Sequence, residues 1–160
     1  MQEDLNLEES LGFAEIYNGG FFNRKVKLLD STLREGEQAP GIHFTKRQRL
    51  QIGWMLDYFG IDAIEISPIV SESHLASCKE LVKAGLQATI VAHGRALPED
   101  IDMALRCDAS FYAMYHSVSD LHLKYKLKVS REEALRRTLT AVDYAKSHGL
   151  KIRVTIEDAS

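Results

Sequence analysis

Two adjacent residues with clear chemical potential, Arg34 and Glu35, lie in the segment LREGEQ. A guanidinium presents a planar set of N–H donors that fits a carboxylate, and a carboxylate oxygen is a ligand for a divalent cation. The pair therefore predicts a site that binds an anionic substrate beside a metal ion. A salt-bridged surface segment is the alternative interpretation of the same two residues.

Polar side chains also lie at the end of every segment whose sequence is typical of a strand. In chain order they are Asp30, Arg34, Glu35 and Gln38, then Glu65, then His93 and Arg95, then His116 and Ser117, and finally Glu157 and Asp158. In a barrel of parallel strands, the residues at the carboxyl ends of the strands form the active site. The pattern predicts such a site, and ordinary loop polarity is the alternative.

The elements that must position these residues alternate regularly after residue 25. Short runs of branched apolar residues predict strands at 26–30, 63–67, 88–93, 111–115 and 151–157, and amphipathic spacing predicts helices at 45–59, 71–85, 97–107 and 130–149. Thr45 with Gln48, and Ser130 with Glu133, are capping boxes. This alternation is typical of βαβ crossovers and a parallel sheet.

Five strands fit either a doubly wound sheet or the front of a barrel. The first strand leads into the charged segment DSTLREGEQAPG, and the chain contains neither GxGxxG nor GxxxxGK[ST]. We therefore expect residues 25–160 to form about the first five βα units of a parallel (β/α)8 TIM-barrel fold. Residues 1–24, which are acidic and then loop-like, are predicted to be an N-terminal extension.

The composition is that of a globular protein. The 160 residues are 45% apolar and 27% charged, with 20 basic and 23 acidic side chains and a sequence pI of about 6.1. This balance argues against nucleic acid as a partner, and no run is long and apolar enough to span a membrane. We expect a cytoplasmic protein in which Cys78 and Cys107 are buried, reduced thiols.

Several side chains of the predicted helices are assigned to core or surface by spacing alone. Trp54, Met55, Leu56 and Phe59 are expected to face the core, while His74 and His148 are expected at the surface. His43, near Lys46, Arg47 and Arg49, is expected to lie on the solvated start of its helix, with a contact to a CoA phosphate as the alternative.

The segment LLDSTLREGEQAPGIHFT resembles the signature of the 2-isopropylmalate and homocitrate synthases, metal-dependent Claisen-condensing barrels related to the hydroxymethylglutaryl-CoA lyases. The resemblance continues through EISP, AHGRA, SVSDLHLKYKLKVSREEAL and TIEDAS. The stretches VSDLHLK and YAKSHGLKIRVTIEDAS are most similar to prokaryotic homocitrate synthases. Arg49 occupies a position that is usually lysine in the family.

The resemblance implies a role for each matching residue. It makes Glu35 a metal ligand, Arg34 a catalytic contact to the 2-oxo acid and its developing alkoxide, Gln38 and His93 substrate-binding residues, and Glu65 and Glu157 catalytic glutamates. It further implies a divalent metal (Zn, Mn or Mg), acetyl-CoA as co-substrate and a 2-oxo acid as acceptor. The preferred acceptor is 2-oxoglutarate, which would place the enzyme in lysine biosynthesis, and 2-isopropylmalate synthesis is the alternative.

Some functional residues of the resembled family have no counterpart in this sequence. An arginine that holds the distal carboxylate in some homocitrate synthases is expected near residues 122–123, where this chain has His122, Lys124 and Lys126. The family's HxH metal ligands and its catalytic base do not occur among these residues. We therefore expect the front part of a longer synthase, inactive alone, that forms a homo-oligomer; an inert half-barrel with an assembly role is the alternative.

Overall fold

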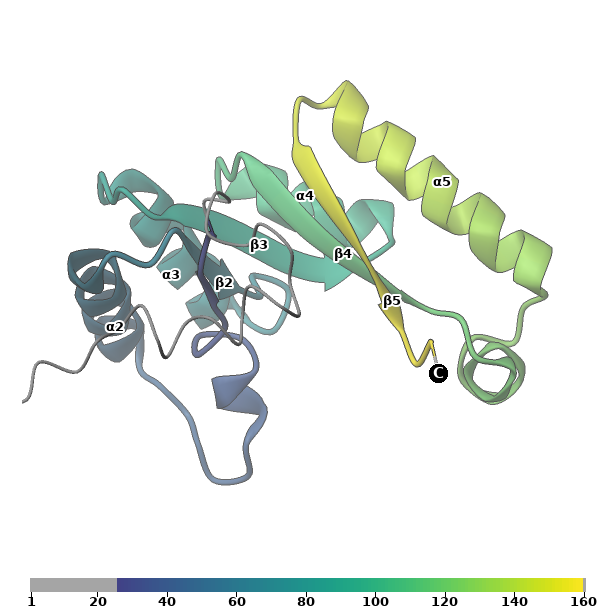
Figure 1. The fold of residues 1–160 in the computed structure, drawn as a ribbon, viewed down its shortest axis with the longest axis horizontal. Helices are drawn as coiled ribbons and strands as arrows, with labels where there is room; N and C mark the ends of the chain where they lie inside the picture. Colours follow the sequence, from purple (N-terminus) through teal and green to yellow (C-terminus); the bar gives the residue numbers. More distant parts are fainter. Residues whose placement is uncertain (1–25, 160) are drawn as a thin grey trace, which may run out of the picture.

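A computed structural model describes residues 26–159, so the predicted extension at 1–24 lies outside the described residues. Five parallel strands form one sheet in the order β1-β2-β3-β4-β5 (Figure 1). They are β1 Leu29–Asp30, β2 Ala63–Ile66, β3 Thr89–Arg95, β4 Phe111–Ser117 and β5 Lys151–Glu157. All five predicted strands are present, and their order is that of consecutive strands in a parallel barrel.

The four helices begin and end close to the predicted residues. They are α2 Lys46–Phe59, α3 Glu72–Lys83, α4 Pro98–Arg106 and α5 Arg131–Ser147. Thr45 and Gln48 form the predicted capping box, and Gly60 ends α2 in the left-handed conformation at φ 90°. The Ser71 and Ser130 side chains cap α3 and α5 by accepting N–H bonds from His74 and Glu133.

The main core lies between one face of the sheet and the helices. It includes Ile64 and Ile66 of β2, Leu75 and Leu81 of α3, Ile101 of α4, and Tyr112 and Met114 of β4. Side chains alternate along a strand, so Glu65, between Ile64 and Ile66, points to the opposite face. The sheet therefore buries an apolar face against the helices and presents the polar residues at its other face.

Helix α2 packs with a different face from the predicted one. Trp54, Met55 and Phe59 are 52%, 70% and 80% exposed, whereas Leu56 packs against the core. The side that meets α3 carries Gly53, where an added Cβ would lie 2.4 Å from Leu81 Cδ2. The absent side chain allows the two helices to approach closely, which turns the aromatic residues outward.

One further surface prediction is wrong, because His74 is buried rather than exposed. His43 is exposed as predicted, whereas Arg49, near it in the sequence, is fully buried. His148 is exposed as predicted, and Cys78 and Cys107 are free, buried thiols as predicted.

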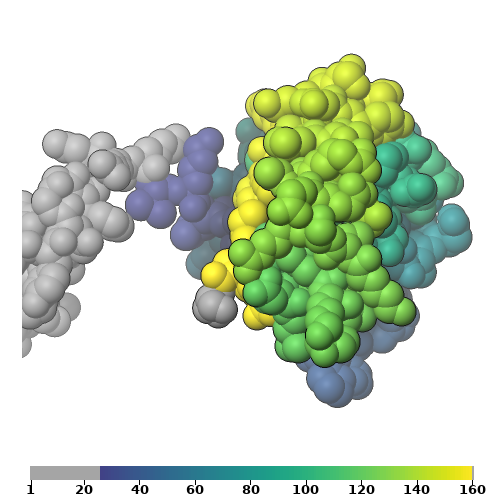
Figure 2. Space-filling view, turned by 90° about the vertical axis from the view of Figure 1, so that its right-hand side faces the viewer, coloured from purple at the N-terminus to yellow at the C-terminus, as the bar shows by residue number. Residues whose placement is uncertain are grey.

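Both outer strands have an unpaired edge within residues 26–159. Strand β5 remains visible in yellow beside α5 (Figure 2), and Val154 and Ile156 are partly exposed there. At the other edge, Leu28 and Leu29 are similarly exposed. The described residues thus form an open half-barrel rather than a closed one.

The connection between β4 and α5 contains a π-helical segment, η3 His122–Leu127, which ends at Lys128 in the left-handed conformation. Its only buried residue is Leu123. No helix among residues 26–159 has the length and apolar character needed to cross a membrane.

Candidate functional site

An open cleft of about 430 Å³ lies at the carboxyl ends of the strands. Its lining consists of Arg34, Glu35 and Gln38 after β1, Ser67, Ile69 and Val70 after β2, His93 on β3, Tyr115 on β4, and Arg153, Thr155 and Glu157 on β5. Five of the six site residues predicted from the sequence line this cleft, and the sixth, Glu65, lies buried beneath it.

Glu65 is the centre of the charge arrangement in the cleft. Its carboxylate is fully buried and accepts a hydrogen bond from Arg34 Nε at 2.6 Å and another from the guanidinium of Arg153. A buried carboxylate is strongly destabilised unless it is paired, and here two guanidiniums pair with it. Glu65 therefore fixes the orientation of both arginines, which are themselves partly exposed to the cleft.

The strand register explains how Arg153 reaches this position. His93 pairs with Ala113, and Ala113 pairs with Arg153, so the three residues form one row across β3, β4 and β5. Residues in one row of a parallel sheet project from the same face. Ala113 contributes only a methyl group between the His93 and Arg153 side chains, and both of these longer side chains line the cleft.

His93 is held by two neighbours. Its Nδ1 lies 3.3 Å from Ser67 Oγ, and its ring stacks on Tyr115 with the centroids 5.3 Å apart. Burial is the main cause that lowers the pKa of His93, and the charges of Arg34 and Arg153 act in the same direction. The imidazole is thus neutral at neutral pH and can donate or accept one hydrogen bond in the cleft.

Glu157 is bound by the last residue of β4 and by a lysine of the segment that follows it. Lys126 Nζ lies 2.7 Å from its carboxylate, and the Ser117 hydroxyl also donates to it. The hydrogen bond from Lys126 is the main cause that lowers the pKa of Glu157, followed by that from Ser117. The Lys126 contact also ties the π-helical segment η3 to the end of β5.

Glu35 is the predicted metal ligand, and its position fits that role in part. Its side chain is 59% exposed at the cleft and pairs with Arg34, so a cation can reach it. Within residues 26–159, however, no three His, Cys, Asp or Glu side chains gather in a geometry that could hold an ion. The described residues offer one ligand and do not complete a metal site.

The other predictions for this region have mixed outcomes. Gln38 ends the 3₁₀ turn η2 Gly36–Gln38 and lines the cleft, as its predicted role requires. Asp30 accepts hydrogen bonds from the backbone and hydroxyl of Thr32, so it shapes the turn after β1. His122 lies 3.6 Å from Asp158 and does not line the cleft.

Sequence analysis did not single out Arg153. Arg153 and Glu157 are four residues apart on one strand, and side chains at even spacing on a strand share a face. That spacing is the signal that could have placed Arg153 in the cleft. Taken together, the site places two guanidiniums, which can donate N–H bonds to a carboxylate, beside a neutral imidazole and three carboxylates, which can accept hydrogen bonds or bind a cation.

Known proteins resemble this chain in sequence over nearly its whole length. A family model described as HMGL-like matches residues 25–160. A probable 2-isopropylmalate synthase of Ignicoccus hospitalis is 46% identical over 138 residues, which cover 86% of this chain and 35% of that protein. The homocitrate synthase AksA of Methanopyrus kandleri is 42% identical, over 85% of this chain and 34% of that protein. A homocitrate synthase of Saccharolobus islandicus is 45% identical, over 85% of this chain and 31% of that protein.

Solved structures resemble it in fold. The hydroxymethylglutaryl-CoA lyase of Pseudomonas aeruginosa superposes with a TM-score of 0.67 at 21% identity, over 82% of this chain and 46% of that one. The lyase of Bacillus subtilis gives a TM-score of 0.65 at 18% identity over the same shares. The likeness confirms the predicted barrel-type fold, of which part is present. The chain spans about a third of the length of the curated relatives that it matches.

Proposed function

Because the chain belongs to the HMGL-like family, we propose that the natural protein condenses acetyl-CoA with a 2-oxo acid. The relatives named homocitrate synthase and 2-isopropylmalate synthase support this reaction class. The natural protein is then a biosynthetic acyltransferase, and residues 26–159 supply part of its acceptor site.

The acceptor that we propose is 2-oxoglutarate, which would be converted to homocitrate. The observation that carries this choice is the presence of two guanidiniums, Arg34 and Arg153, in one cleft. A 2-oxo dicarboxylate has a carboxylate at each end, and each end can accept hydrogen bonds from one guanidinium. A branched monocarboxylate such as 2-oxoisovalerate would leave one of them without a substrate partner.

Arg153 also bears on the contact to the distal carboxylate of the substrate. A distal-carboxylate arginine was expected near residues 122–123, where this chain has none. The structure has a guanidinium in the cleft at Arg153 instead, across β4 from His93. We assign the distal carboxylate to Arg153, with His93 as the second contact.

The other side chains have roles that follow from charge. An enolate formed from acetyl-CoA attacks the keto carbon, and the carbonyl oxygen becomes an alkoxide. Arg34, held by Glu65, would donate to that oxygen. Glu35 would hold one coordination position of a divalent ion, which would polarise the carbonyl together with ligands from outside the described residues.

Glu157 is the remaining carboxylate at the cleft. Lys126 and Ser117 lower its pKa and keep it ionised, so it is suited to accept hydrogen bonds and to orient a donor rather than to act as an acid. We thus propose Arg34 and Glu157 as catalytic residues and Glu65 as the group that positions Arg34 for catalysis. The proposed substrate contacts are Arg34, Gln38, His93 and Arg153, and Glu35 is the proposed metal ligand.

One specific observation favours a second candidate. The relative from Ignicoccus hospitalis that is 46% identical is named a probable 2-isopropylmalate synthase. That activity uses the same reaction with a branched monocarboxylate acceptor. The two candidates therefore differ in acceptor preference alone.

The test is the release of CoA thiol by the natural protein with acetyl-CoA and each of 2-oxoglutarate, 2-oxoisovalerate and pyruvate. The assay is repeated with Mg²⁺, Mn²⁺, Zn²⁺ or a chelator. A preference for 2-oxoglutarate supports the proposal, and a preference for 2-oxoisovalerate moves the assignment to 2-isopropylmalate synthase. No release with any acceptor would leave the inert half-barrel as the better interpretation.

A further inference from the structure

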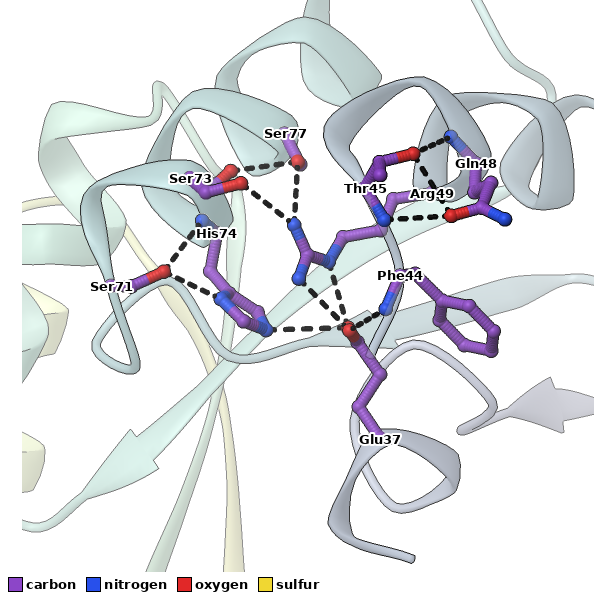
Figure 3. Close-up of polar contacts among 9 residues, drawn as sticks. All are labelled: Glu37, Phe44, Thr45, Gln48, Arg49, Ser71, Ser73, His74 and Ser77. Atoms are coloured by element: carbon purple, nitrogen blue, oxygen red, sulfur yellow. Dashed lines mark hydrogen bonds and ion pairs between the residues drawn. The ribbon is translucent and has the colours of Figure 1, made fainter. Parts of the chain in front are cut away.

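A buried polar cluster lies behind the turn that carries Arg34 and Glu35 (Figure 3). It joins Glu37 of that turn to Arg49 of α2 and to His74 and two serines of α3. The side chains of Arg49, Glu37 and His74 are 0%, 7% and 7% exposed. None of these three side chains lines the cleft, so the cluster is separate from the candidate site.

The geometry of the cluster is closely specified. Arg49 donates from Nε and Nη2 to the two oxygens of Glu37 at 2.7 and 2.9 Å, which is a bidentate pair. Its Nη1 donates to Ser73 at 3.0 Å and reaches Ser77 at 3.5 Å. Glu37 also accepts the backbone N–H of Phe44 at 3.0 Å, at the other end of the same loop.

His74 completes the cluster in a defined tautomer. Its Nε2 lies 3.2 Å from Glu37, and its Nδ1 lies 2.8 Å from Ser71 Oγ. Burial and the charge of Arg49 lower the pKa of His74, so the ring is neutral. Its single ring proton then belongs on Nε2, where it is donated to Glu37, while Nδ1 accepts the Ser71 hydroxyl proton.

Fold stability alone does not account for a buried charge cluster of this kind. A buried ion pair is often no more stable than apolar side chains of the same volume, because removing two charges from water offsets their attraction. A bidentate pair differs from apolar packing in that it fixes direction. Glu37 therefore has one orientation relative to α2 and α3.

The turn transmits that orientation to the cleft. Glu35 and Glu37 flank Gly36 in a turn closed by hydrogen bonds from Arg34 N and Glu35 N to Ser31 O, at 3.0 and 2.8 Å, and from Gln38 N to Glu35 O at 3.0 Å. Glu35 lines the cleft, while Glu37 points to the helices. Fixing Glu37 on one side of the turn thus fixes Arg34 and Glu35 on the other.

We propose that Arg49 is a positioning residue. Together with Glu37 and His74, it holds the turn of residues 31–38 in one orientation. In that orientation Arg34 contacts Glu65, and Glu35 lies at the cleft. The test by kcat/KM rests on the proposed function, whereas the test by hydrogen exchange does not depend on it. Groups that orient catalytic side chains in this way typically change activity by about 10- to 100-fold when removed.

The decisive variant removes both charges at once. Glu37→Leu with Arg49→Met leaves no buried charge without a partner, but it removes the acceptor of the Phe44 and His74 N–H groups, so the natural protein is expected to stay folded with a lowered melting temperature. Hydrogen exchange measured by mass spectrometry should become at least about tenfold faster for residues 33–38, and kcat/KM for the 2-oxo acid should fall by about 10- to 100-fold. The matched control is Arg47→Met, an exposed arginine on the same helix, which should change neither quantity.

Glu37→Gln with Arg49→Gln tests the same inference if the first pair of substitutions does not fold. An amide at position 37 can still accept the Phe44 N–H, but no bidentate ion pair remains, so the fold is retained and faster exchange with a loss of activity is expected. The inference is overturned if either folded variant keeps kcat/KM and exchange within twofold of the unchanged protein. A natural protein without condensing activity would refute the proposed function, while the exchange comparison would still decide the role of Arg49.

Discussion

Substitution of Arg153 by methionine separates the two acceptor assignments. Arg153 has five N–H donors, and one hydrogen bond to Glu65 engages it within residues 26–159. Its side chain is 39% exposed, so the remaining donors can reach a substrate in the cleft. We expect Arg153→Met to weaken the reaction of 2-oxoglutarate and to leave that of 2-oxoisovalerate little changed.

The expected size follows from charge and exposure. A hydrogen bond between charged groups contributes about 1.5–3 kcal/mol, and partial exposure places this one in the lower half of that range. A loss of about 2 kcal/mol corresponds to roughly a 30-fold decrease in kcat/KM. Glu65 also loses one partner, but Arg34 remains at 2.6 Å, and this indirect effect applies equally to both acceptors.

The assay compares kcat/KM for 2-oxoglutarate and 2-oxoisovalerate, measured by release of the CoA thiol. The control variant is Lys151→Met, which removes an exposed cation from the same strand outside the cleft. The ratio of the two kcat/KM values should fall by roughly 30-fold for Arg153→Met and stay constant for the control. An equal loss with both acceptors would show that Arg153 acts through Glu65 and does not bind the distal carboxylate.

Four further outcomes are expected. In the natural protein, Glu35→Gln should abolish the dependence of activity on a divalent metal without changing the circular dichroism spectrum, and unchanged metal affinity in calorimetric titration would exclude Glu35 as a ligand. Lys126→Met should raise the pKa of Glu157, which Lys126 now lowers, so that activity is lost at a higher pH on acidification; an unshifted pH profile would mean that ionised Glu157 is not required. Gly94→Ala would place a Cβ 2.4 Å from the Tyr112 hydroxyl oxygen and should lower the unfolding free energy by about 2 kcal/mol, most of which should return when Tyr112→Phe is added. Additive losses in the double variant, measured by denaturant titration, would contradict this clash. The isolated 160-residue chain should scatter light as a dimer or larger species because the edges of β1 and β5 are unpaired within residues 26–159, and a stable monomer would contradict that expectation.

The order and type of the elements could be predicted because local signals agree with the fold. The alternation of short apolar runs and amphipathic segments located all five strands, and Thr45, Ser71 and Ser130 each cap the predicted helix. The carboxyl-end rule for parallel strands placed Arg34, Glu35, Gln38, His93 and Glu157 in one cleft, whereas Arg95, predicted by the same rule, pairs with Asp100 and does not line it. These features depend on neighbours in the sequence, which pattern analysis can examine.

The packing of α2 could not be predicted in the same way. Its sequence contains two stripes at helical spacing, one through Arg49, Gly53 and Leu56 and another through Trp54, Tyr58 and other large apolar residues. Apolar content favours the second stripe as the core face, but the close contact at Gly53 and the partner of Arg49 select the first. Both determinants lie on other elements, so periodicity carries no information about them.

Arg49 and His74 show the same limit for polar residues. A basic residue early in a helix normally lies in water, and a helical histidine among polar neighbours does as well. Their burial depends on Glu37, which is 12 residues from Arg49 in the sequence. A tertiary partner that satisfies the charge cannot be identified from the composition of either helix.

The strand order has a consequence for how this region assembles during synthesis. Every strand pairs with the next one in the chain, and the paired residues Ser117 and Glu157 are 40 positions apart. A pairing across 40 residues forms slowly because the intervening chain must first be ordered, but each new βα unit can add to the edge left by the one before. As the chain leaves the ribosome, the exposed edge would therefore move from strand to strand, and the most recently made strand would be the one open to mispairing with other nascent chains.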